Sequence, residues 1–229
     1  MMKLDIYSDP ICPWCYIGKA YLDRALENLN DKPFSMEWHP YQLNPNIPLP
    51  GINRQKYLEE KFGGKKAFLK AYGPIYEHAK KLGIKLAIAK IQKTPNTLNA
   101  HRLIHWAGLK GCQTSLVTAL FEAYFLEGKD LGDAYTLSEI ASRFSMGNDT
   151  IRHRFKTDLD LNEIQKRDKT AKIMGIQSVP VFIVANTHVV IGAQPTAFWE
   201  KFIFEIRRIE PEAGLQNVRP IPGHLSNTS

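Results

Sequence analysis

Two cysteines separated by two residues, Cys12 and Cys15, have the spacing of a thiol pair that can close a small reversible disulfide. In thiol–disulfide exchange one thiolate attacks a disulfide, and a second thiol within reach then resolves the mixed disulfide and releases the product. The flanking residues place the pair after a short strand and at the start of a helix, where we expect both sulfurs at the exposed end. Unpaired backbone N–H groups and the helix dipole favour a thiolate there. The spacing therefore predicts a redox-active dithiol.

A second motif, Ser178-Val179-Pro180, precedes the apolar run 181–184. Proline cannot donate a hydrogen bond to a strand ladder, so its place at the head of a strand indicates a specific role. The Val179–Pro180 bond is a candidate cis peptide, because only bonds to proline adopt the cis form at low cost.

Two β-containing parts must position these motifs. Alternating or apolar runs rich in β-formers predict strands, and 3.6-residue periodicity predicts helices. The first part is a strand–helix–strand unit with a parallel crossover, and the second is a hairpin followed by a helix. The expected elements of the two parts are 3–8, 13–29 and 34–39, then 181–184, 188–192 and 196–209.

A proline-rich connector at 40–53, which we expect to lack regular structure, leads into a long helical block. We expect Gly73-Pro74 to kink or split one helix, and Thr136 with Glu139 to form a capping box. The expected helices of the block are 54–62, 65–82, 97–110, 114–127, 136–144 and one or two within 149–174.

Neither β-containing part can cover both faces of a sheet alone, so the two must combine into one sheet and the helical block must be an insertion. The expected division is a discontinuous domain formed by 1–45 and 160–210, a helical insertion at 46–159, and a flexible tail at 211–229.

The composition narrows the function classes. The chain has 229 residues and a formal net charge of +7, but its lysines recur at helical spacing among apolar residues, which is typical of a solvated helix face. We therefore expect no nucleic-acid partner, and a mild preference for acidic partners such as glutathione. No 18-residue apolar run and no leader pattern are visible, so we expect no membrane association and a cytoplasmic location.

Three cysteines are too few for a disulfide framework. A structural zinc site needs two further ligands, and neither Cys112 nor the scattered histidines supply a pair, so we expect no metal. Cys112 itself is interpreted as a lone, partly buried thiol. Trp14 is expected to be an exposed contact surface beside the dithiol.

Other polar residues leave alternatives open. Asn96 is explained by an N-cap and His101 by a satisfied core histidine, although either could contact substrate. A buried acid that relays protons to Cys15 would be useful, and Asp5 or Glu37 could serve.

The chain resembles the thioredoxin superfamily through its CxxC motif and the later Val-Pro before a strand hairpin, and its helical insertion resembles the DsbA branch. The stretches 8–15, 40–45, 96–103 and 175–182 resemble the FrnE-like subfamily, which is related to 2-hydroxychromene-2-carboxylate isomerase and kappa-class glutathione transferase. The resemblance covers roughly residues 3–209. It implies an α/β thioredoxin-like fold, with a mixed sheet and a large all-helical insertion.

The resemblance also implies roles. Cys12 would attack and Cys15 would resolve, while cis-Pro180 would lie beside Cys12. The Val179 backbone would pair an extended substrate strand. Pro13 and Trp14 would tune the thiols and present an aromatic surface.

Three functions follow as hypotheses. The leading one is a thiol–disulfide oxidoreductase acting on protein or small-thiol disulfides, with no bound cofactor and glutathione as a possible redox partner. The second is a glutathione-dependent isomerase or transferase acting on aromatic or polyketide-like substrates, whose relatives often carry serine at the first cysteine position. The third is a redox-gated binding or chaperone module.

Overall fold

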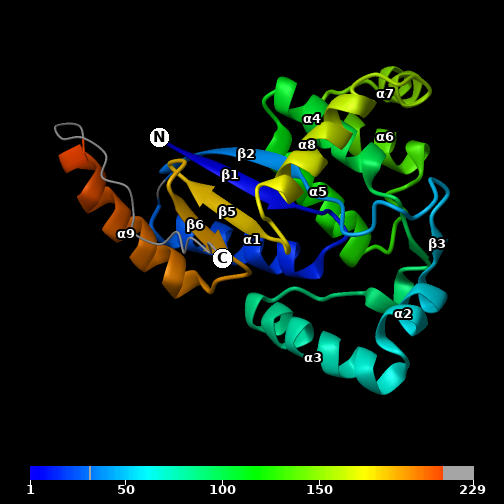
Figure 1. Ribbon diagram of the computed structural model, residues 1–229, viewed down its shortest axis with the longest axis horizontal. Coiled ribbons are helices and arrows are strands. Elements are labelled where there is room, and N and C mark those ends of the chain that lie inside the picture. The colour runs from blue at the N-terminus through cyan, green and yellow to red at the C-terminus, as the bar shows by residue number, and fades with distance from the viewer. Residues whose placement is uncertain (31, 214–229) are drawn as a thin grey trace, which may run out of the picture.

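The computed structural model describes residues 1–30 and 32–213. Its centre is a four-stranded sheet, with α9 on one side and the helices of the block gathered beyond the other end (Figure 1). The chain first forms β1 (Met2–Ser8), α1 (Pro13–Asn28) and β2 (Phe34–Pro40), and it ends with β5 (Val181–Val184), β6 (His188–Ile191) and α9 (Thr196–Ala213).

The sheet has the order β2-β1-β5-β6, with β1 and β2 parallel and the other neighbours antiparallel. It is therefore a mixed sheet assembled from both ends of the chain, as the sequence predicted. The β5–β6 turn has positive φ at Ala185 and Asn186, the backbone of a tight hairpin turn whose twist matches the strands.

Alternation along the strands gives the sheet two different faces. Ile6 pairs with Phe182 in register, and the Phe182 ring packs edge-on against the fully buried Trp199 of α9. Helix α1 packs beside α9 and approaches the β5 end closely: a side chain at Gly18 would meet Pro180 Cγ at 3.0 Å. The opposite face carries Asp5 and Glu37 and is covered by α8 (Leu161–Ile173), which packs on β2.

Along the chain, the helical block lies between β2 and α8. It consists of α2 (Arg54–Phe62), α3 (Lys65–Leu82), a 3-10 turn η1 (Ile88–Lys90), α4 (Leu98–Leu109), α5 (Gln113–Phe125), α6 (Ala134–Ser142) and α7 (Asn148–Phe155). Each predicted helix is present within a few residues of its expected bounds.

Two local predictions were wrong, and a third holds only in part. The connector is not wholly irregular, because β3 (Ile52–Asn53) pairs with β4 (Lys93–Thr94). Of the expected kink or split at Gly73-Pro74, the split is absent, since α3 continues through Pro74. Helix α6 is capped by the Asp133 carboxylate, which accepts from Thr136 N at 2.8 Å, because Asp133 is the stronger capping residue and starts the helix a turn earlier.

The expected division at 45/46 and 159/160 stays a prediction. Residues 211–213 belong to α9 rather than to the predicted tail, so the expected start of the tail was at least three residues too early. The rest of the predicted tail, residues 214–229, lies outside the described residues. Within residues 1–30 and 32–213, no helix has the length and apolar character needed to cross a bilayer.

Candidate active site

The two motifs singled out in the sequence meet at the start of α1. Cys12 is the N-cap residue and Pro13 occupies the first helical position, where its missing N–H is not needed. The Cys12 thiol points to Val179 O, with Sγ and the oxygen 3.7 Å apart. The Val179–Pro180 peptide bond is cis. Residues 167 positions apart therefore form one site, with a thiol at a helix N-terminus and an adjacent strand end.

Both cysteines are free, and both are more buried than expected. Cys12 is 4% exposed and Cys15 is 1% exposed, so the prediction of two sulfurs at an exposed helix end was wrong. The cause is neighbouring structure: the cis-proline segment covers one side, and α3 packs beside α1 on the other. Trp14 is half-buried rather than exposed, because its ring lies edge-on to His78 of α3 at 5.4 Å.

Burial distinguishes Cys15 from Cys12 electrostatically. It raises the pKa of Cys15 well above the ordinary value, and the neighbouring Cys12 sulfur adds to the shift. Cys15 therefore stays protonated in the free dithiol.

Asp9 is a buried acid beside the dithiol that sequence reasoning missed. Its side chain has no exposed surface, and its Oδ2 accepts from Leu43 N at 2.8 Å, while its backbone oxygen accepts from Cys12 N at 2.9 Å. Burial raises the pKa of Asp9 to about 7, against the hydrogen bonds that favour the carboxylate. In the sequence, Asp9-Pro10 directly follows the first expected strand, and no local signal shows that the carboxyl turns inward.

His101 of α4 faces this acid. Its ring is 3% exposed, and Nε2 lies 4.0 Å from Asp9 Oδ1 without a hydrogen-bond partner among the described residues. Burial lowers the pKa of His101 to about 3. His101 is therefore buried, as expected of a core histidine, but its Nε2 makes no hydrogen bond with the described residues. It lies beside Asp9, the buried acid next to the dithiol.

Other polar residues in and just before α4 have structural partners. The prediction of Asn96 as N-cap was wrong, because Thr97 occupies that position; Asn96 Oδ1 accepts from Leu98 N at 2.9 Å in a local turn, and its Nδ2 donates to Ile47 O at 2.6 Å. Arg102 is 1% exposed and donates to the carbonyl oxygens of Arg154 and Leu159. These contacts tie the connector and the end of α7 to α4.

The relay candidates Asp5 and Glu37 lie elsewhere, on the sheet face under α8. Asp5 Oδ1 lies 2.6 Å from His39 Nε2 and 2.9 Å from Lys3 Nζ, and Glu37 Oε1 accepts from Arg167 at 2.8 Å. Helix α1 packs against the other face, so the sheet separates both carboxylates from the helix that carries Cys15. The geometry does not support either as a relay.

Asp5, Glu37 and His39 also place their ligand atoms close enough together to hold a metal ion, and no other such acid–histidine group is found among the described residues. Lys3 and Arg167 already match its two carboxylates with two cations, so the group is internally neutralised. Cys112, half-buried at the start of α5, donates to Ala107 O at 3.6 Å and joins neither cluster.

Comparison with protein families gives a match to the DSBA-like thioredoxin domain over residues 3–204. The chain belongs to this family. The match spans both β-containing parts and the helices between them, which agrees with one fold assembled around an insertion.

Individual relatives agree with this assignment. The chain is 26% identical over 207 residues to the uncharacterized protein YwbO of Bacillus subtilis (strain 168), covering 88% of this chain and 96% of that protein. Among solved structures, a probable DsbA oxidoreductase from Streptomyces coelicolor has a TM-score of 0.80 at 22% identity, covering 96% of this chain and 94% of the other.

Two further structures share the fold at 14% identity. A 2-hydroxychromene-2-carboxylate isomerase has a TM-score of 0.69, with 94% of this chain and 100% of the isomerase covered. The cytosolic disulfide reductase DsbM of Pseudomonas aeruginosa, solved with GSH, has a TM-score of 0.62, with 90% and 99% covered. The family is one of thiol oxidoreductases, whose fold also serves an isomerase.

Proposed function

We propose that this protein is a thiol–disulfide oxidoreductase whose reacting groups are Cys12 and Cys15. The observation that carries the proposal is the position of Cys12, as N-cap of α1, with its sulfur 3.7 Å from Val179 O next to a cis-proline. In the first turn Pro13 lacks an N–H and Cys15 N donates to Cys12 O at 3.1 Å, so the Trp14 N–H and the helix dipole stabilise negative charge there.

The reaction proceeds in two exchanges. The Cys12 thiolate attacks one sulfur of a substrate disulfide, forms a mixed disulfide and expels the other sulfur as a thiolate, which takes up a proton. Cys15 then loses its proton and attacks the Cys12 sulfur, which releases the second substrate thiol and leaves a Cys12–Cys15 disulfide. The substrate gains two electrons and two protons, and the protein dithiol loses them.

The raised pKa of Cys15 suits this order of events, because a protonated Cys15 does not compete with Cys12 for the first attack. Substrate recognition is assigned to the Val179 backbone and to the half-buried Pro13 and Trp14, where an extended segment of substrate would pair beside the dithiol. The same exchange run backwards would oxidise a substrate.

For the redox partner we propose glutathione, and for the compartment a reducing one such as the cytoplasm. Support comes from the fold shared with a cytosolic disulfide reductase solved with GSH, and from a chain whose three cysteines include only one close pair.

The test is turnover of glutathione disulfide and of insulin by the wild type, by Cys12→Ser and by a Cys112→Ser control. We expect Cys112→Ser to match the wild type, and Cys12→Ser to lose turnover on both substrates. Equal rates for wild type and Cys12→Ser would overturn the assignment.

A glutathione-dependent isomerase or transferase remains the second candidate, favoured by the fold shared with an isomerase along its whole length. Cysteine at position 12 argues against this candidate. A serine hydroxyl there would hold a glutathione thiolate, whereas Cys12 can instead form a disulfide with Cys15. Chromene-carboxylate turnover that survives in Cys12→Ser would favour this candidate over the first.

A further inference from the structure

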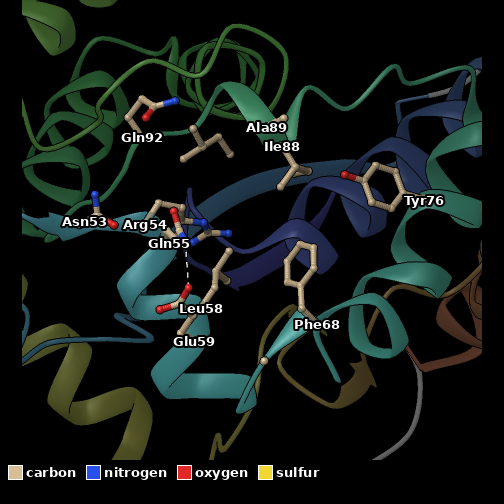
Figure 2. A pocket seen from close by; sticks show the side chains of 12 residues that line it. Asn53, Arg54, Gln55, Leu58, Glu59, Phe68, Tyr76, Ile88, Ala89 and Gln92 are labelled. Atoms are coloured by element: carbon tan, nitrogen blue, oxygen red, sulfur yellow. Dashed lines mark hydrogen bonds between the residues drawn. The ribbon is translucent and has the colours of Figure 1, made fainter. Parts of the chain in front are cut away.

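A cavity of about 490 Å³ lies inside the helical block, between α2, α3 and the segment around η1 (Figure 2). Its volume falls in the range of small-molecule sites. Much of the lining is apolar, namely Leu58, Phe68, Tyr76, Ile88, Ala89 and Ile91, and Arg54 is among its polar residues.

Arg54 is the unusual member of this lining. The residue is only 6% exposed, and its guanidinium donates to two neutral oxygens, Thr94 Oγ1 at 3.2 Å and Tyr72 Oη at 2.7 Å. Its Nε has no hydrogen-bond partner, and no carboxylate of the described residues lies within ion-pair distance of it. Figure 2 shows the Arg54 side chain beside Leu58, facing the same space as Phe68 and Ile88.

A guanidinium carries a full charge and five donors, and burial of an unpaired charge is costly. Two neutral hydrogen bonds use two donors and neutralise none of the charge. The acidic residue of the lining, Glu59, is exposed and accepts from Gln55 at 2.9 Å, so it leaves the Arg54 charge unmatched. The planar fork of arginine fits the two oxygens of a carboxylate, which would supply the missing counter-charge.

We propose that this cavity binds a small carboxylic acid with an apolar or aromatic body, with its carboxylate paired to Arg54. The apolar lining selects the body, and the buried cation selects the acid over neutral analogues. The site goes beyond the proposed dithiol chemistry and does not depend on it.

The test uses the full chain as Cys12→Ser, so that loss of redox activity cannot affect the outcome. The probe is 2-naphthoate, and the matched neutral probe is 2-naphthamide. Binding is followed by isothermal titration and by NMR of the methyl groups of Leu58, Ile88 and Ile91. We expect naphthoate to bind with shifts at these methyls, and the amide to bind at least ~10-fold more weakly.

Two variants separate binding from folding. Arg54→Gln removes the cation and should weaken naphthoate binding at least ~10-fold, while its thermal unfolding is checked against the parent. Tyr72→Phe removes a structural partner of Arg54 but keeps the charge, so naphthoate binding should persist. Equal loss in both variants would show that Arg54 acts through the fold alone, and would overturn the proposal.

The remaining outcomes are equally decisive. Equal binding of amide and acid would show that the cavity is an apolar pocket without selection for the acid. Absence of naphthoate-induced shifts at Leu58, Ile88 and Ile91 would show that naphthoate does not bind in this cavity. Inorganic phosphate that binds as tightly as naphthoate, or displacement of naphthoate by reduced glutathione, would overturn the assignment to an apolar acid.

Discussion

Two groups of acid and histidine side chains lie within this protein, and they differ in their neighbours. Asp5, Glu37 and His39 lie under α8 with Lys3 and Arg167 beside them. We refer to these five residues as the paired cluster. Its charges are matched, so its carboxylates remain ionised.

Although burial opposes it, hydrogen bonds from Lys3 and His39 hold the pKa of Asp5 below its ordinary value. His39 has a pKa lowered by burial, and Arg167 donates to its Nδ1 at 2.8 Å, so Nε2 carries the proton that Asp5 accepts. The paired cluster is thus an ion network with a neutral histidine.

Asp9 and His101, the buried pair, have the same residue types with the opposite outcome. Both are buried without a cation within hydrogen-bond distance, and burial raises the pKa of Asp9 to about 7 and lowers that of His101 to about 3. Neighbouring charges and hydrogen-bond donors, rather than residue type, therefore decide which acids near this sheet are ionised. Asp5 and Glu37 are therefore poor relay candidates on two grounds: the sheet separates them from α1, and their partners keep them ionised.

The largest expected effect comes from breaking the buried pair at His101. His101 has a folded pKa below its unfolded value, so the unfolded state binds more protons and stability rises with pH between about 3 and 6.5. In His101→Leu, which lacks this contribution, the free energy of unfolding relative to wild type should therefore fall by on the order of 5 kcal/mol across that range. Urea unfolding of both proteins at half-unit pH steps measures the difference; a pH-independent difference would contradict a neutral, buried His101.

Breaking the pair at Asp9 should give the reverse slope. Asp9 has a folded pKa above its unfolded value, so the folded state binds more protons and stability falls as pH rises from about 4 to 7. In Asp9→Asn, which lacks this contribution, the free energy of unfolding relative to wild type should rise by on the order of 4 kcal/mol over that range. The same urea series tests this, and a difference that does not change with pH would show that the Asp9 carboxyl keeps its ordinary pKa in the folded protein.

The paired cluster should respond more weakly. Arg167→Met removes donors to Glu37 and His39, and should lower stability by about 1–2 kcal/mol at pH 7, since Glu37 is partly exposed. Although burial opposes it, His39 and Arg167 lower the pKa of Glu37, so this contribution is present above its unfolded pKa and fades as pH falls through the folded value. Unfolding of wild type and Arg167→Met is measured at pH 7 and at pH 3. An equal loss of stability at both pH values would argue against an ionic contribution.

The smallest effect is expected at Lys3, whose side chain is 48% exposed. Lys3→Met should lower stability by less than about 1 kcal/mol, and 0.5 M salt should reduce the difference further. Its rate of disulfide exchange should equal that of the wild type, because the sheet separates the paired cluster from the helix that carries the dithiol. A slowed exchange would place the paired cluster in the reaction.

The sequence shows the site's local motifs and not its long-range partners. The dithiol and Val179-Pro180 could be found because their chemistry depends on spacing and on proline's missing donor. Asp9 meets His101 across 92 positions, and Arg54 looks like an ordinary first residue of an exposed helix; the packing of α2 against α3 and β4 buries it. The misplaced cap at Thr136 shows a second limit, because two capping patterns overlap there and Asp133 is the stronger acceptor.

The central claim is that Cys12 attacks and Cys15 resolves. The most direct measurement is mass spectrometry of the intact double variant Cys15→Ser with Cys112→Ser after incubation with glutathione disulfide. Without the resolving thiol, the mixed disulfide should accumulate as a single glutathione adduct on Cys12, whereas the matched variant Cys12→Ser with Cys112→Ser, which keeps only Cys15, should stay largely unmodified. A protein that stays unmodified at Cys12, or an adduct that forms faster on Cys15 in the matched variant, would contradict these roles.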